Sequence, residues 1–453
     1  MNDLTRRHFA RAAGLATAAS YSRILGANDR VRLGYIGVGN RGDQVHEGFL
    51  EHGDCQTAAV CDLREDYMDM AVKKSRATPT KYKEYKKLLD DNSVDAVVIA
   101  TPDHWHALMF VDACNAGKDV YVEKPLSLTV ADGRKMVETA ERTRRVVQVG
   151  TNRRSWKSYK EAADFVRSGA LGHVTVARCF HVHNEWPNGL GPAPDGPPPS
   201  DWEWDQWLGP APKVPYNRNR AWYNFRWFYD YSGGQVTNFG VHYIDVIRWF
   251  LGQDAPRSVT AIGGKYAGIR DNREIPDTIE VLWEFDGPTL VVFAQYNANA
   301  APGNAPNSEI ELRGAKGTMY IRAGRWEVVA EKVGEGVIGY DEGRGYGNPL
   351  NRAGGRGFPE SMKPAMQDVP ARGPAGYDEV SHPRNFLDCI RSRGKCNADV
   401  LTGHLSTTAT LIANIAHKTE SSLKWDAAAE RFTNHPEANR YLQYKYREPY
   451  KLA

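Results

Sequence analysis

The sequence predicts an α/β protein whose N-terminal third forms a doubly wound parallel sheet and whose later part is richer in β-strands. Three observations predict this architecture. Short apolar runs alternate with helical stretches at first, a glycine-rich turn follows the first run, and strand-like alternation dominates later. The chain has 453 residues, 41% of them apolar and 25% charged. This is the composition of a globular protein, and the length allows two or three domains of roughly 150 residues each.

Residues 1–28 are predicted to be an export signal. Thr5–Arg11 contains two adjacent arginines and is followed by the uncharged, alanine-rich stretch Ala12–Ser22. The segment resembles a twin-arginine signal, and a disordered basic N-terminus is the alternative. Its apolar part is much shorter than the roughly 20 residues of a membrane span. The signal would take the folded protein, with its cofactor bound, through the twin-arginine export machinery to the bacterial periplasm, and the cleavage site stays open.

Charge and cysteine content argue against two other classes of protein. The formal net charge is +3, and the excess comes from arginines of the N-terminal segment. This near-neutral balance does not indicate a nucleic-acid-binding protein. The six cysteines show no C-x-x-C spacing. We therefore expect structural thiols rather than a zinc site or a set of disulfides.

Residues 29–151 are predicted to form the parallel sheet. Strands that are covered by helices on both faces are almost continuously apolar, and five short runs have this character. The expected strands are Val31–Val38, Thr57–Cys61, Ala96–Ala100, Val120–Val122 and Val146–Val149, and the expected helices between them include Tyr67–Leu89 and Val130–Arg142.

Residues 152–453 are predicted to form a second, β-rich domain. A helix at Tyr159–Ser168 precedes a strand at Val174–His183, and the irregular stretch Trp186–Trp227 follows. Gly343–Gly376 is expected to be a long loop, a lid or an intersubunit arm. Alternation of apolar and polar residues predicts an antiparallel sheet after the irregular stretch. Its expected strands are Val259–Gly263, Thr278–Phe285, Thr289–Tyr296, Glu309–Arg313 and Thr318–Ile321, with a closing helix at Gly403–His417.

The turn after the first strand predicts a dinucleotide site. Gly37–Gly42 has the pattern G-x-G-x-x-G, which permits a tight turn, close approach of a pyrophosphate and close helix packing. The helix N-terminus adds partial positive charge. Asp62, after the second strand, would accept hydrogen bonds from a ribose 2′-hydroxyl and so favours NAD, although two nearby arginines would suit the extra phosphate of NADP. The expected cofactor contacts here are Gly37, Gly39, Asn40, Arg41, Gly42, Asp62 and Arg64.

Two further motifs follow strands of this sheet, at the carboxyl edge where parallel sheets bind ligands. They are Thr101–His106 and Glu123-Lys124-Pro125. Together with the glycine turn, Gly233-Gly234 and Gly240–Asp245, they resemble the glucose–fructose oxidoreductase/inositol dehydrogenase/MocA (Gfo/Idh/MocA) family. The resemblance runs from about Val31 to the C-terminus. It implies a Rossmann domain joined to an α/β domain with a large open, mainly antiparallel sheet.

The resemblance also implies ligands and partners. Members of this family usually oxidise or reduce sugars and cyclitols with a nicotinamide cofactor. They usually associate through their open sheets, so we expect a homodimer or homotetramer. The C-terminal helices are expected to be able to pack back on the Rossmann domain. The further expected cofactor contacts are Thr101, Pro102, His104, His106, Glu123, Lys124 and Asn152.

Lys124 and His242 are the expected catalytic residues, with a surface lysine and a buried structural histidine as the alternatives. An ammonium near the reacting hydroxyl stabilises developing alkoxide charge, and a histidine with a reference pKa of about 6.5 suits a general base. If Gln235–Leu251 is one helix, Asn238, His242 and Asp245 share a face. Inositol dehydrogenases have an aspartate at the position of Asn238. The amide is therefore expected to orient His242 without stabilising its charged form, and Asp245 to compensate.

Aromatic and histidine side chains are expected to line the substrate site. Six of the twelve tryptophans lie between Trp186 and Trp227. Flat rings suit the apolar faces of pyranoses, although packing is the alternative for most of them. Two histidines and Glu185 alternate on one strand, where pocket lining is favoured over a metal site because no fourth ligand is evident. Arg220 and Arg226 are available for hydroxyls or a carboxylate. The expected substrate contacts are Trp222, Arg226, Tyr243, His181 and His183.

Three functions are compatible with these residues. The favoured one is a sugar, glycoside or cyclitol oxidoreductase in which His242 takes the hydroxyl proton, Lys124 assists and hydride goes to NAD(P). Free nicotinamide cofactor is not supplied outside the cytoplasm, so an exported enzyme would keep its cofactor tightly bound and reset it with a second substrate. Returning hydride to the same molecule instead would give a redox-neutral NAD-dependent glycosidase, although known glycosidases of this fold lack the lysine. The third function is sugar binding or regulation without catalysis.

Overall fold

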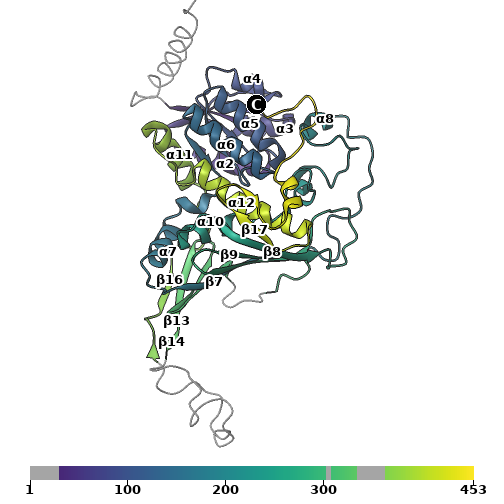
Figure 1. Ribbon diagram of the computed structural model, residues 1–453. Helices are drawn as coiled ribbons and strands as arrows, with labels where there is room; N and C mark the ends of the chain where they lie inside the picture. The colour runs from purple at the N-terminus through teal and green to yellow at the C-terminus, as the bar shows by residue number, and fades with distance from the viewer. Residues whose placement is uncertain (1–29, 302–307, 334–362, 453) are drawn as a thin grey trace, which may run out of the picture.

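The computed structural model has the α/β architecture that the sequence predicts, with a parallel sheet in the N-terminal part and a large, mainly antiparallel sheet in the C-terminal part. It describes residues 30–301, 308–333 and 363–452. The predicted export signal and most of the predicted Gly343–Gly376 loop lie outside the described residues. Figure 1 shows the two sheets one above the other, with helices between them.

The N-terminal sheet has the strand order β3-β2-β1-β4-β5-β6, and all of its pairings are parallel. Its inner strands are buried over their whole length because helices cover both faces. The strands are β1 (Val31–Ile36), β2 (Cys55–Cys61), β3 (Thr80–Tyr82), β4 (Ala96–Ile99), β5 (Asp119–Val122) and β6 (Val147–Val149), and the helices are α2 (Asn40–Leu50), α3 (Glu65–Lys74), α4 (Tyr85–Leu89), α5 (Asp103–Asn115) and α6 (Val130–Thr143).

One predicted element of this domain is wrong. The stretch Tyr67–Leu89 is not one helix, because it holds the end of α3, the strand β3 and the helix α4. β3 is an edge strand in which Thr80 and Lys81 are exposed. An edge strand of three residues buries too little side chain to leave an apolar run in the sequence.

The C-terminal sheet has ten strands in the order β16-β13-β12-β11-β7-β10-β9-β8-β17-β18. Within this sheet, β7 and β10 are the only described neighbours that pair in parallel. The strands are β7 (Val174–Val182), β8 (Pro256–Gly264), β9 (Thr278–Phe285), β10 (Thr289–Tyr296), β11 (Ile310–Gly314), β12 (Gly317–Arg322), β13 (Arg325–Ala330), β16 (Val369–Arg372), β17 (Leu423–Asp426) and β18 (Arg431–Phe432), and a separate small ribbon pairs β14 (Lys332–Val333) with β15 (Lys363–Pro364).

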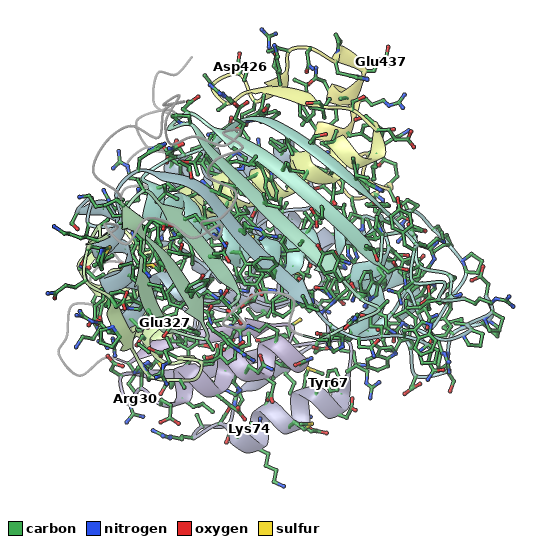
Figure 2. All side chains as sticks on the ribbon, turned by 90° about the horizontal axis from the view of Figure 1, so that it is seen from below. Arg30, Tyr67, Lys74, Glu327, Asp426 and Glu437 are labelled. Carbon is green, nitrogen blue, oxygen red and sulfur yellow. The ribbon has the colours of Figure 1, made fainter. Side chains whose placement is uncertain are left out.

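Helices cover one face of this sheet. Alternate residues of β9 are buried, and Val281, Trp283 and Phe285 join the core under α10 and α12. Figure 2 shows the opposite face, where the strands carry no described helix over most of their length. The remaining helical segments are η1 (Asn152–Ser155), α7 (Lys157–Arg167), α8 (Trp204–Leu208), η2 (Trp222–Trp227), α9 (Gly234–Asn238), α10 (Gly240–Leu251), α11 (Ser381–Ser392), α12 (Val400–Lys418) and η4 (Pro436–Leu442).

The C-terminal segments pack back on the N-terminal domain. Phe386 of α11 lies in the same apolar cluster as Phe49 of α2, with their ring centres 6.3 Å apart. α12 contacts α6 on one side and α10 and β8 on the other. The chain ends beside α5 (Figure 1), where Tyr450 packs edge-on against Trp105. No helix among the described residues is long and apolar enough to cross a bilayer.

Candidate active site at the carboxyl edge of the parallel sheet

The glycine turn forms a cradle at the start of α2. Gly37 has a φ of 84°, and a side chain there would lie 2.7 Å from the carbonyl oxygen of Ala100. A side chain at Gly42 would collide with the carbonyl oxygen of Gly37. In this described part of the chain no side chain caps α2 at Gly39, so the N–H groups of its first turn are available to an anion. These features fit the pyrophosphate of a dinucleotide.

Asp62 follows β2 and supports the same turn. One of its carboxylate oxygens accepts a hydrogen bond of 2.9 Å from the backbone N–H of Val38, and the other accepts one of 3.0 Å from the N–H of Arg64. Burial raises the pKa of this carboxyl group. A carboxylate has about four acceptor positions. Asp62 therefore keeps capacity for a ribose hydroxyl, as expected for an NAD site.

Arg41, which is expected to contact the cofactor and would suit the extra phosphate of NADP, is paired with protein carboxylates in the structure. Its Nε donates to Glu123 at 2.9 Å, and its Nη1 donates to Glu379 at 3.0 Å. Glu379 also accepts a bond of 3.4 Å from the amide of Asn152. Burial opposes ionisation of Glu123, but Arg41 and Lys124 hold its pKa below the usual value. This network ties the glycine turn to the ends of β5 and β6, and no signal in the sequence pointed to Glu379.

Trp222 lies beside the glycine turn, which differs from its expected place at the substrate. The guanidinium of Arg64 is 4.5 Å from the centre of the Trp222 ring and 5.0 Å from that of Tyr67. A side chain at Gly39 would lie 3.1 Å from the Tyr67 ring. Arg64 also pairs with Asp66, its Nε donating at 2.7 Å. The segment between β7 and α9, which carries α8, thus reaches across to the parallel sheet (Figure 1).

The two histidines after β4 face backbone carbonyl groups. His106 lies between the carbonyl oxygens of Thr101 and Pro125, at 2.9 Å from Nε2 and 2.8 Å from Nδ1. It therefore joins the loops that follow β4 and β5. The Nε2 of His104 is 3.2 Å from the carbonyl oxygen of Trp207, and burial lowers the pKa of this histidine to about 3. Both rings support the loops around the site.

Lys124, directly after β5, is held by Asn238. Its Nζ donates to the side-chain oxygen of Asn238 at 2.7 Å and to the backbone carbonyl of the same residue at 3.3 Å. Burial lowers the pKa of Lys124 to about 8; the carboxylate of Glu123 opposes this shift, and the charge of Arg226 adds to it. At neutral pH the side chain is mostly an ammonium ion close to its titration range.

The predicted helix 235–251 is broken, and this changes two expected contacts. α9 ends at Asn238 and α10 begins at Gly240, so Asn238 bonds to Lys124 instead of His242. Asp245 does not compensate. Its carboxylate accepts 2.7 Å bonds from Arg154 and from the hydroxyl group of Ser406. In the described structure, neither residue that was expected to orient the histidine makes a hydrogen bond to its ring.

His242 occupies the first turn of α10 as a neutral imidazole. Burial holds its pKa well below the usual value, and the charges of Lys124 and Arg153 add to the effect. Its Nδ1 is buried and has no hydrogen-bond partner in the described structure. A neutral imidazole next to an ammonium group can accept a proton at neutral pH.

His181 of the second domain packs beside the residue that follows Asn238, the partner of Lys124. The ring of His181 stacks on Phe239, which separates α9 from α10, at 4.2 Å between centres. Burial lowers the pKa of His181 to about 4, and the charges of His183 and Arg226 contribute. Over the described residues, no group of three His, Cys, Asp or Glu side chains is arranged to hold a metal ion.

Tyr243 is a core residue and does not line the site as predicted. Its side chain is buried among the residues between the large sheet and its helices. The guanidinium of Arg153 lies 4.9 Å from its ring centre. The hydrophobic side of α10 thus includes Tyr243, whereas His242, one residue earlier, lies on a different side of the helix.

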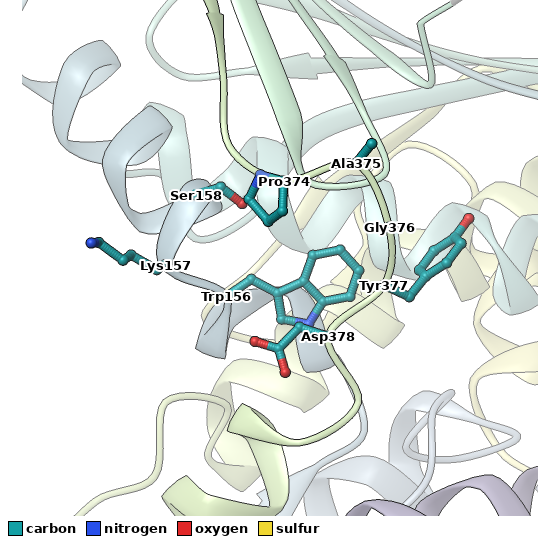
Figure 3. A pocket seen from close by; sticks show the side chains of 8 residues that line it. All are labelled: Trp156, Lys157, Ser158, Pro374, Ala375, Gly376, Tyr377 and Asp378. Atoms are coloured by element: carbon teal, nitrogen blue, oxygen red, sulfur yellow. The ribbon is translucent and has the colours of Figure 1, made fainter.

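A separate cavity of about 170 Å³ lies at the start of α7. Figure 3 shows that the side chain of Trp156 and the segment Pro374–Asp378 form its walls. Lys124, Asn238 and His242 do not line it. This cavity is therefore distinct from the site built on the glycine turn.

The comparisons with known proteins agree with this arrangement. Residues 31–151 match a family model described as "Oxidoreductase family, NAD-binding Rossmann fold", and residues 157–280 and 356–452 match one described as "Oxidoreductase family, C-terminal alpha/beta domain". The chain is 31% identical over 215 residues to "Glycosyl hydrolase family 109 protein 1" of Shewanella sp. (strain ANA-3), and 30% identical over the same length to "Alpha-N-acetylgalactosaminidase" of Shewanella oneidensis. Each alignment covers 40% of this chain and 47% of the relative, so the match spans about half the length of these relatives.

Solved structures show the same fold. A levoglucosan dehydrogenase, solved with NADH and levoglucosan, superposes with a TM-score of 0.62 and 16% sequence identity, covering 87% of this chain and 99% of that one. At this identity the similarity establishes the architecture of both domains and nothing about the substrate.

Proposed function

Since the chain belongs to the Gfo/Idh/MocA oxidoreductase family, we propose that it transfers hydride between a bound nicotinamide dinucleotide and a hydroxyl-bearing carbon of a sugar, glycoside or cyclitol. One observation carries the proposal. The ammonium of Lys124 is fixed by Asn238 at the end of β5, beside a glycine turn shaped for a dinucleotide. A nicotinamide bound there would supply the hydride acceptor.

The chain's own residues supply proton transfer and charge stabilisation. His242, held neutral, accepts the proton of the reacting hydroxyl group. Lys124 donates a hydrogen bond to the same oxygen and stabilises its developing negative charge. Asn238 positions Lys124 through its side-chain and backbone oxygens. The burial of both groups strengthens these interactions because little water screens them.

We propose NAD as the cofactor, retained between turnovers. Asp62 suits a free ribose hydroxyl, and the two arginines that would attract a 2′-phosphate are paired with carboxylates. Trp222 and Tyr67 flank Arg64 beside the glycine turn, where they would cover the adenosine end. A covered adenosine would leave slowly, as suits an enzyme that we propose is exported through the twin-arginine signal and works as a homodimer or homotetramer.

A redox-neutral glycosidase is the second candidate. It is favoured by the names of the Shewanella relatives, which describe glycoside hydrolysis. It would use the same site, with hydride returned to the sugar after the aglycone has left. We place it second because this chain keeps Lys124, whereas the known glycosidases of this fold lack the lysine.

The test uses the purified protein with its co-purifying cofactor and a panel of sugars, glycosides and cyclitols. Mass spectrometry identifies the cofactor, and nicotinamide absorbance follows its reduction. We expect stoichiometric reduction by at least one compound, and Lys124→Ala to keep the cofactor while losing roughly 10²–10⁴-fold in rate. Lys157→Ala, at an exposed lysine of α7, is the control. Aglycone release without a lasting absorbance change would favour the glycosidase, and unchanged turnover in Lys124→Ala would remove Lys124 from the mechanism.

A further inference from the structure

Arg226 is partly buried and differs in its partners from the other arginines of the site and the core. Within the described residues, Arg153 pairs with Glu309 at 3.0 Å and Arg154 with Asp245 at 2.7 Å. The partly buried Arg41 and the buried Arg248 and Arg273 likewise have carboxylate partners. Arg226 makes no ion pair with a carboxylate in the described structure, and its Nε is buried without a hydrogen-bond partner.

Two acids lie near Arg226, and each of them bonds another group. Asp103 and Glu185 are the two acids whose charges act on Arg226. Asp103 accepts a hydrogen bond of 2.6 Å from the hydroxyl group of Ser232. Glu185 accepts one of 2.8 Å from Arg273. Neither carboxylate lies within ion-pair distance of the Arg226 guanidinium, which instead packs 3.4 Å from the centre of the Tyr223 ring.

Arg226 belongs to η2, the segment that borders the glycine turn. Trp222 of the same segment packs 4.5 Å from Arg64. After burial, the positive charge of Arg226 contributes to lowering the pKa of Lys124 and that of His181. His181 stacks on Phe239, the residue that follows Asn238. The groups whose charges act on Lys124 therefore include a second cation, Arg226, and two carboxylates that already bond other groups, since Glu123 pairs with Arg41 and Asp103 accepts from Ser232.

An unpaired buried cation is costly, and arginine is the side chain best shaped to hold a carboxylate through two parallel hydrogen bonds. From this arrangement we propose that Arg226 binds the carboxylate of an acidic sugar, a uronate or aldonate, whose hydroxyl group faces Lys124. The inference rests on the proposed function and narrows its substrate class. One unpaired guanidinium matches a group with a single negative charge, which argues against a phosphate ester.

The test compares matched pairs of ligands on the holoprotein. Isothermal titration calorimetry compares the binding of glucuronate, galacturonate and gluconate with that of their neutral counterparts glucose, galactose and glucitol. Glucose 6-sulfate is measured as well, to test whether a monoanion other than a carboxylate binds. We expect at least one carboxylate to bind tenfold or more tightly than its neutral counterpart. Arg226→Met should remove this preference, and Arg226→Lys should restore only part of it.

Arg218→Met is the matched control, because Arg218 lies in the same segment, is exposed and bonds only a backbone carbonyl at 3.3 Å. It should keep the preference for the acid. Equal or tighter binding of the neutral sugars, no binding of any acid, tight binding of the sulfate alone, or an unchanged preference in Arg226→Met would each overturn the proposal. Nicotinamide absorbance is recorded in parallel. An acid that binds through Arg226 without reducing the cofactor would contradict the oxidoreductase function and leave the carboxylate site standing.

Discussion

The charge of Lys124 sets the pH range in which this residue can assist oxidation. Its pKa is lowered to about 8, so the ammonium form is present below that pH and is lost as the pH rises through it. His242 is neutral over the same range because its pKa lies well below the usual value. A rate that needs an ammonium at Lys124 and a neutral His242 is therefore level near neutrality and falls above pH 8.

Asn238→Asp gives the sharpest test of this assignment. A carboxylate 2.7 Å from Nζ would favour the ammonium form and raise the pKa of Lys124. We expect the falling limb of kcat/KM for oxidation to move to higher pH by about one to three units. The measurement is the pH–rate profile of the wild type and the variant with the same sugar.

Asn92→Asp is the control for that profile, because Asn92 is exposed in the turn before β4, at the opposite end of the sheet. It should leave the falling limb in place. A wild-type rate that rises through pH 8 would instead make neutral Lys124 the proton acceptor. A limb that does not move in Asn238→Asp would show that the contact does not govern Lys124 during turnover.

Sequence reasoning found the chemistry of the site but not its pairings. Lys124 and His242 were located by motifs that directly follow or begin regular elements. The partner of Lys124 is 114 residues away, and such a bond depends on how two domains pack. The same reason explains why Glu379, which joins Arg41 from the start of α11, could not be anticipated.

At the level of elements, the glycine turn is a feature whose backbone geometry leaves no room for a side chain. A methyl group at Gly42 would collide with the carbonyl oxygen of Gly37, which is backbone and cannot rotate away. We expect Gly42→Ala to lower stability by about 1–3 kcal/mol and to abolish dinucleotide retention. Thermal unfolding and the cofactor content of the purified variant measure the two effects.

Gly53→Ala is the matched control, since no atom lies within 4 Å of a side chain added there. It should keep both the stability and the cofactor. A Gly42→Ala protein that retains a full complement of dinucleotide would contradict the cradle.

Elements were predicted where burial leaves a clear pattern. β4 and β5 are buried throughout and appeared as apolar runs, and β9 alternates because one face meets helices. The break between α9 and α10 was missed because Phe239 and Gly240 leave the apolar periodicity intact. β3 was missed because an exposed edge strand has no periodicity to detect.

At the scale of the whole molecule, the C-terminal segments join the two domains. Arg447 donates to Asp205 at 2.7 Å and to the carbonyl oxygen of Gly209 at 2.9 Å, linking the chain end to the α8 segment. Because α11 and the last residues pack on the first domain, the first domain contains chain from both ends of the described sequence. The hydrophobic periodicity of the sequence reports on residues close together in the chain. It could not specify which distant segments the C-terminal residues contact.

The open face of the large sheet is the surface on which we expect copies of the chain to associate. Ile262 of β8 and Leu290 of β10 point away from the helices and are 72% and 38% exposed. Exposed apolar side chains on one sheet face commonly mark an interface.

We expect the double variant Ile262→Glu/Leu290→Glu to convert a dimer or tetramer into a smaller species at micromolar concentration, because each glutamate would have to be buried without a partner. Light scattering during size-exclusion chromatography gives the mass. Leu401→Glu, at a 37% exposed leucine of α12 on the helix side, should keep the wild-type mass, whereas a wild-type monomer or an unchanged double variant would place association elsewhere.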